Sequence, residues 1–205
     1  MNADSTILIE KNRHVLKSIL KCIEFCGRRG ITLRGHRDND TQIDTAEKDS
    51  HHTNTGNFKE LIRFQIDSGD SILEEHLRNC PKNATYVSKM QNELLLCIKM
   101  FIQNKIVEEV KNQPFGPFFG YQCDEVRDSG NWEQLGLVLR YVVHGKPVER
   151  LFEFIETEDV SGKSLCRHII KSLTDVGLDI KNCRSQTMDG AGNVWPKRRM
   201  RCFIY

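Results

Sequence analysis

The chain has 205 residues, with 30 Lys and Arg against 28 Asp and Glu, so its formal net charge is only +2. Such a balance gives no argument for nucleic-acid binding from charge alone. No apolar run approaches the roughly 18–20 residues that a membrane-spanning helix needs. The first residues also lack a basic segment before an apolar stretch, which argues against a signal peptide. We therefore expect a nuclear or cytoplasmic protein that is not secreted and has no membrane partner.

Eight cysteines are spread along the chain, between residues 22 and 202. They form no Cys-x-x-Cys pair and no Cys/His set at zinc-finger spacing. Most stand among apolar residues, as Cys97 and Cys166 do. This setting favours reduced thiols in the core over disulfides, and no zinc site is predicted.

The first part of the chain predicts one helix and one loop. Apolar residues recur at steps of three and four over Asn12–Gly27, which is typical of a helix, and we assign residues 1–33 to this N-terminal helical region. Residues 34–56 are polar and almost free of apolar side chains, so they are predicted to form a loop.

Residues 57–113 are predicted to be helical and carry no obvious chemistry. The pattern indicates helices over 57–68, 71–78 and 89–110, the last of which is ended by Pro114 and Pro117. In the first of these helices, the side chains expected in the core are Phe58, Leu61, Ile62 and Phe64.

Residues 114–194 predict a second kind of structure, in the order β-β-β-α-β. Three strand-like runs are followed by a helix and a fourth strand, with a four-residue hairpin loop at His144–Pro147. The crossover through the helix makes the fourth strand parallel to the first. The predicted fold class is therefore α+β. The expected strands are 118–123, 135–143, 148–155 and 180–188, and the expected helix is 161–176.

Two aspartates stand where the first and fourth strands are predicted to end: Asp124 and Asp189. If these strands are neighbours, the two carboxylates converge. Mg²⁺ prefers oxygen ligands and is often held by one or two carboxylates, and phosphoryl-transfer enzymes use such sites. An aspartate at a strand end is also a common turn former or helix cap. The residues alone leave both interpretations open.

Several blocks in this order resemble one family, and together they span about residues 12–194. The blocks resemble hAT-superfamily transposases and, more narrowly, the domain of unknown function shared by zinc finger MYM-type protein 1 and TTF-type, transposase-derived proteins. The matching stretches are Leu33–His36, Gly56–Leu61, Tyr86–Glu93, Cys123–Ser129 with Glu133–Leu135 and Leu139–Val142, and Asp189–Asn193.

The resemblance implies an RNase H-like catalytic fold with an Asp-Asp-Glu triad and a divalent metal, which performs DNA strand cleavage and transfer. By position, Asp124 corresponds to the first triad aspartate and Asp189 to the second. The third carboxylate lies far downstream in relatives, so residues 114–194 are interpreted as a partial RNase H-like domain whose two Mg²⁺-binding carboxylates are vestigial, and Mg²⁺ is not expected to be retained.

The resulting hypothesis is a truncated, transposase-derived protein without DNA cleavage activity. Two alternatives stay open. One is residual Mg²⁺-dependent nuclease or strand-transfer activity, and the other is a nuclear protein–protein interaction module formed by the helical region. The partners implied are DNA or related transposase-derived proteins, in a homo- or hetero-oligomer.

The last residues, 195–205, depart from the family pattern. Pro196 disfavours a helix at the point where relatives continue into one. We therefore interpret 195–205 as an aberrant basic tail, derived from another reading frame or a spliced intron. Its cluster Lys197–Arg201 can be interpreted as a nuclear-import or phosphate-contacting patch, or as a segment without function.

Overall fold

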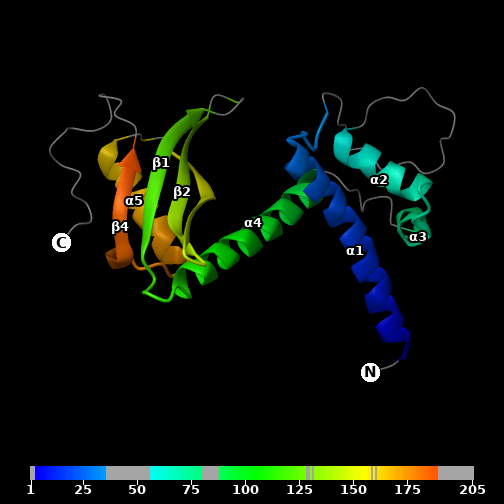
Figure 1. Ribbon diagram of the computed structural model, residues 1–205. Helices are drawn as coiled ribbons and strands as arrows, with labels where there is room; N and C mark the ends of the chain where they lie inside the picture. Colours follow the sequence, from blue (N-terminus) through cyan, green and yellow to red (C-terminus); the bar gives the residue numbers. More distant parts are fainter. Residues whose placement is uncertain are drawn as a thin grey trace. The chain divides into compact units, whose positions relative to one another are not determined.

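The structure, a computed structural model, divides the chain into two units, Met1–Cys97 and Ile98–Tyr205 (Figure 1). The border between the units falls inside helix α4 (Ser88–Lys111). Each unit is considered by itself below. The residues that the structure describes are 3–35, 56–79, 88–127, 130, 132–157, 159 and 161–188.

The first unit is helical, as predicted. Helix α1 (Ala3–Arg29) begins well before the expected Asn12, because no Gly or Pro interrupts the residues that precede Asn12. It packs against α2 (Asn57–Asp67) and α3 (Ser71–Asn79). Most of the predicted loop 34–56 lies outside the described residues. The buried apolar side chains of this unit are Val15, Ile19, Cys22, Ile23, Cys26, Phe58, Ile62, Leu73 and Leu77.

The core of α2 differs from the prediction at Phe64, and Leu61 is only half-buried. Phe58 and Ile62 are buried, as their spacing of four residues requires, but Phe64 is 67% exposed. In a helix with 3.6 residues per turn, Phe64 lies on the side opposite to Ile62. The prediction that Phe64 belongs to the core was therefore wrong. The side chain of Lys59 is buried instead.

The second unit confirms the α+β class and the predicted element order. Its four strands form one sheet with the order β3-β2-β1-β4, in which β1 is antiparallel to β2 and parallel to β4. The first and last strands of the sequence are thus neighbours, as expected. The bounds are β1 (Phe119–Arg127), β2 (Glu133–Val143), β3 (Lys146–Glu156), α5 (Gly162–Asp175), the short 3₁₀ helix η1 (Ile180–Asn182) and β4 (Cys183–Met188).

Two strand boundaries correct the prediction. β1 continues past its apolar run to Arg127, because its antiparallel pairing with β2 continues as far as Glu133. β4 begins only at Cys183, because the preceding residues form η1. The side chain of Asp179 accepts a hydrogen bond from the Lys181 backbone N–H, at 2.9 Å, and so caps this short helix.

The hairpin between β2 and β3 is tighter than the predicted four-residue loop. Its turn contains only His144 and Gly145, whose φ angles of 49° and 75° are both positive, as in a type I′ turn. Pro147 was wrongly assigned to the loop and instead pairs with Val142. A proline fits there because β3 is an edge strand of the sheet.

One face of the sheet carries the core of the second unit. Alternate side chains of β1 and β2 point to this face and pack against α5, which lies behind the strands in Figure 1, and against the last turns of α4. The side-chain amide of Gln103 on α4 donates to the carbonyl of Phe152, at 3.1 Å. The opposite side of the sheet is the open face: no helix among the described residues covers it. The fully buried side chains of the core include Tyr121, Leu135, Leu137, Leu139, Leu165, Ile169 and Leu173.

Candidate functional site

Asp124 lies within β1, directly after Cys123, which pairs with the last described residue of β4. The pairing of β1 with β2 continues to Arg127, whereas the described pairing of β1 with β4 ends at Cys123 opposite Met188. The expectation that Asp124 ends the first strand was therefore wrong, because β1 continues to Arg127. The Asp124 side chain is exposed, and within the described part of the chain it makes no hydrogen bond or ion pair.

The neighbours of Asp124 on the open face create a shallow hollow. Asp124 pairs with Gly136, which in turn pairs with Phe154 on β3. Because Gly136 has no side chain, the Phe154 ring packs across it, and a Cβ at this glycine would lie 3.5 Å from the ring. The hollow has a volume of about 420 Å³. Its lining includes Gln122, Asp124, Val126, Gly136, Val138, Leu151, Phe154 and Thr187.

In the row of side chains next to Gln122, the open face carries a polar cluster whose charges are paired. Glu149 of β3 accepts hydrogen bonds from Arg140 Nη1, at 2.8 Å, and from Gln122 Nε2, at 2.9 Å. The charge of Arg140 is thus paired with the charge of Glu149. Because this pair is neutral, the cluster contributes no unpaired positive charge beside the hollow.

Two contacts hold the parallel strands β1 and β4 against each other. On the core face, the Tyr121 hydroxyl donates to Gln186 Oε1, at 2.9 Å. On the open face, a Cβ at Gly120 would lie only 2.1 Å from Ser185 Oγ, so a glycine permits this close approach of β1 and β4. A register shift occurs at the same place, between Phe119 and Gly120.

Asp189 itself lies outside the described residues, and β4 is described only as far as Met188, the residue before it. The convergence of Asp124 and Asp189 therefore stays a prediction. The described ranges contain no group of three or more His, Cys, Asp or Glu side chains that could hold a metal ion. The basic tail 195–205 also lies outside them.

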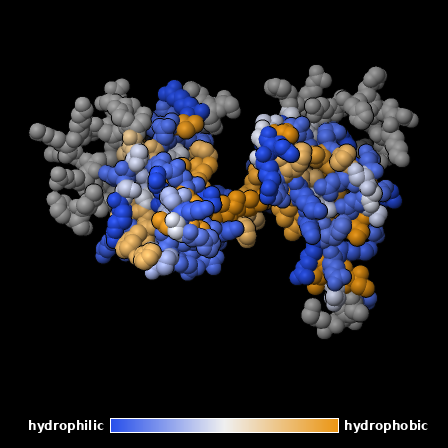
Figure 2. Space-filling model, in the orientation of Figure 1, coloured by the Kyte–Doolittle hydropathy of each residue, from blue (hydrophilic) through white to orange (hydrophobic). Residues whose placement is uncertain are grey.

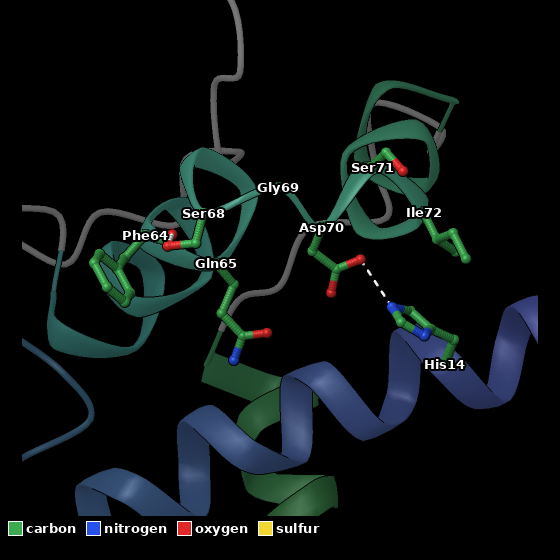
Figure 3. Close-up of a pocket in the computed structure, with 8 residues that line it drawn as sticks. All are labelled: His14, Phe64, Gln65, Ser68, Gly69, Asp70, Ser71 and Ile72. Carbon is green, nitrogen blue, oxygen red and sulfur yellow. Dashed lines mark hydrogen bonds and ion pairs between the residues drawn. The ribbon is translucent and has the colours of Figure 1, made fainter.

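A second polar cluster, which the sequence did not predict, is centred on Asp70 in the helical unit (Figure 3). Asp70 Oδ1 lies 2.8 Å from His14 Nε2 of α1 and also accepts the Leu73 backbone N–H, at 3.1 Å. The Ser18 hydroxyl donates to Asp70 Oδ2, at 2.6 Å. Burial raises the pKa of Asp70, but the hydrogen bonds from Ser18, Leu73 and His14 outweigh it and hold the pKa below its ordinary value.

The Asp70 cluster has a structural role, because it links α1 to the start of α3. Asp70 caps the N-terminus of α3 and at the same time fastens α1 to the turn between α2 and α3. An open pocket of about 400 Å³ lies beside it, between His14, Phe64 and Ile72. The sequence offered one signal for it, because an aspartate directly before a helical pattern is a typical N-cap. The partners Ser18 and His14, more than fifty residues away, could not be inferred from that signal.

The described cysteines are free thiols, and Cys22, Cys26, Cys123 and Cys183 are buried. Burial, together with the neighbouring Cys26, raises the pKa of Cys22 to about 11 despite a hydrogen bond from Gln65. These thiols behave as small core residues, as predicted. Cys97 is exposed, contrary to the expectation from its apolar neighbours.

Comparison with known proteins identifies the family. Residues 1–197 match the family described as "DUF4371: ZMYM1/FAM200, RNase-like domain". The chain is also similar to the "52 kDa repressor of the inhibitor of the protein kinase" of mouse and of human, with 24% identity over 183 residues in each case. Each match covers 88% of this chain but only 23% of the relative. No helix in the described ranges is long and apolar enough to cross a membrane. The chain belongs to the ZMYM1/FAM200 RNase-like domain family.

Proposed function

We propose that this member of the ZMYM1/FAM200 RNase-like family is a transposase-derived protein of the hAT type that keeps two metal-binding carboxylates, Asp124 and Asp189. We further propose that the 205-residue chain does not cleave DNA by itself. The observation that carries the proposal is the parallel pairing of β1 with β4, in which Cys123 lies opposite Met188. Each of these residues directly precedes one of the two aspartates.

Strand geometry supports the pairing of the two carboxylates. Adjacent strands lie about 4.7–4.9 Å apart, and side chains alternate between the two faces of a sheet. On β1, Cys123 faces the core and Asp124 the open face; on β4, Met188 packs toward the core. The proposal extends this alternation by one residue, so that Asp189 would share the face of Asp124.

Two carboxylates, from Asp124 and Asp189, are suitable ligands for a hard divalent cation. Mg²⁺ is commonly held by one or two carboxylates, with water and phosphate oxygens completing its shell. A cation held by Asp124 and Asp189 would supply Lewis-acid activation of a phosphate oxygen. Two-metal strand cleavage needs further oxygen ligands, and the resemblance to hAT transposases assigns the third to a glutamate far downstream of Asp189. We therefore expect weak metal binding without cleavage.

The first test measures Mn²⁺ and Mg²⁺ binding to the whole chain by titration calorimetry and by paramagnetic broadening. Asp124→Ala and Asp189→Ala should each abolish binding. Asp175→Ala is the matched control, because this exposed aspartate is the last residue of α5 and not part of the sheet. Equal binding by all four proteins would refute the carboxylate pair.

The second test is a nicking assay on supercoiled DNA with Mg²⁺ or Mn²⁺. We expect no nicking above the level of the two alanine variants. Metal-dependent nicking that is lost in both Asp124→Ala and Asp189→Ala, and kept in Asp175→Ala, would instead establish the alternative of a residual nuclease.

A further inference from the structure

The open face of the sheet has an apolar part that the metal proposal does not use. Three rows of paired side chains cross β1, β2 and β3 there. Three of their apolar members are exposed, Val126 by 45%, Leu151 by 51% and Phe154 by 49%, whereas Val138 is half-buried. In Figure 2, orange side chains interrupt the blue surface on the side of the sheet where β2 and β3 lie. An exposed apolar group of this kind marks an interaction site more often than scattered single residues do.

The size of this apolar group fits a helix. Across the sheet, Val126 on β1 and Phe154 on β3 are separated by two strand spacings, or about 10 Å, and they lie in neighbouring rows. An α-helix with its side chains is about 10–12 Å across. The hollow described above lies in this surface and is lined by Asp124, Gly136 and Phe154. A side chain from a docked helix can enter there.

The charges on the open face favour a basic partner. Asp124 lies at one side of the apolar group, and Glu156 follows two residues after Phe154 on the same face. Neither carboxylate has an ion-pair partner within the described residues. The basic side chain of the face, Arg140, is neutralised by Glu149. Such a surface repels the phosphates of nucleic acid and attracts Lys and Arg.

We propose that the open face binds an amphipathic helix of a partner protein, with an apolar stripe against Val126, Leu151 and Phe154 and basic residues beside Asp124 and Glu156. A groove that accepts the apolar side of a helix is a common mode of peptide recognition. A second copy of this chain is a poorer occupant, because a stable dimer buries about 20–30 residues per partner and this group is much smaller. The proposal requires neither Asp189 nor a metal.

The test uses the whole chain and a fluorescein-labelled synthetic 18-residue peptide of Leu and Lys, with Leu at helical spacing, followed by fluorescence anisotropy. We expect saturable binding that weakens at least about tenfold in the double variant Leu151→Ser/Phe154→Ser, because each lost apolar contact costs roughly 1 kcal/mol or more. Phe115→Ser is the matched control, because Phe115 is 88% exposed and lies outside the sheet. It should bind like the unmodified protein.

A charge variant keeps the test valid if the double serine variant folds poorly. Asp124→Asn/Glu156→Gln preserves side-chain size, and it should weaken binding severalfold and flatten its dependence on salt. The same peptide with Glu in place of Lys should not bind. Absence of saturable binding, equal binding by the sheet variants and the Phe115→Ser control, or equal binding of the Glu peptide would each overturn the proposal. Sedimentation that shows self-association through Leu151 and Phe154 would overturn it in favour of a second copy.

Discussion

Replacing Asp70 with Ala should destabilise the helical unit more than any other exposed or half-buried polar substitution in it. Asp70 accepts three hydrogen bonds, from Ser18, from His14 and from the Leu73 backbone N–H. The substitution removes a helix N-cap, at a cost of about 1 kcal/mol. It also leaves the Ser18 hydroxyl, on a residue that is only 6% exposed, without its acceptor, at a cost of about 1–3 kcal/mol.

The contact with His14 adds less to this sum. The imidazole side chain is 45% exposed, so solvent screens its interaction with Asp70 and the loss is below about 1 kcal/mol. The expected change in the free energy of unfolding is therefore about 2–4 kcal/mol. Asp70→Asn should cost roughly half as much, because an amide oxygen can still accept the Leu73 N–H.

Urea denaturation followed by circular dichroism at 222 nm measures the change, and hydrogen exchange of the α3 amides assigns it to the helical unit. Asp67→Ala is the matched control, since Asp67 is an exposed aspartate at the end of α2. A loss in Asp70→Ala that lies within about 0.5 kcal/mol of the loss in Asp67→Ala would refute the reasoning, because substitutions of ordinary surface residues fall within that range.

Three further predictions concern pH, strand contact and the two faces of the sheet. Because the folded-state pKa of Asp70 is lowered, the stabilisation by its carboxylate is present above its unfolded pKa of about 3.9 and is lost as pH falls through the folded pKa. The free energy of unfolding should therefore fall less steeply with decreasing pH in Asp70→Asn than in the unmodified protein. Identical pH curves for the two proteins would contradict this. Gly120→Ala should lower stability by about 1–3 kcal/mol, measured by thermal denaturation, and Ser185→Gly should recover part of the loss, since its Oγ is the colliding atom. Leu139→Ala on the core face should lower the free energy of unfolding by about 2–5 kcal/mol, and Leu151→Ala on the open face by about 0.5 kcal/mol. Similar losses in the two variants would show that the open face is covered.

The sequence predicted the fold best where periodicity is strong. The order β-β-β-α-β, the single crossover and the neighbouring position of the first and last strands follow from alternation and from the handedness of crossovers. The errors fall where tertiary pairing overrides the apolar pattern. β1 extends beyond Cys123 through polar residues because β2 supplies hydrogen bonds to them. The two-residue turn at His144 was missed because His-Gly is a weaker type I′ signal than Asn-Gly.

The candidate site was only partly accessible to sequence reasoning. The motif around Asp124 identifies the carboxylate, but not the hollow beside it, because that hollow depends on the register that places Gly136 between Asp124 and Phe154. Likewise, Asp70 can be recognised as a helix cap, whereas its contacts with Ser18 and His14 depend on how α1 packs on the turn before α3. Both cases require long-range contacts that a local pattern does not encode.

The pairing of β1 with β4 also has a consequence for the order of folding. β2 and β3 join across a two-residue turn, and such local hairpins form within microseconds. Cys123 and Met188 are 65 residues apart (188 − 123), so β4 reaches β1 only after the crossover helix is in place, and closing such a loop is slow. Cys123 and Met188, the residues that precede Asp124 and Asp189, therefore meet late. A cation that binds both carboxylates would select the completed sheet over earlier intermediates, slowing unfolding while leaving the rate of hairpin formation unchanged.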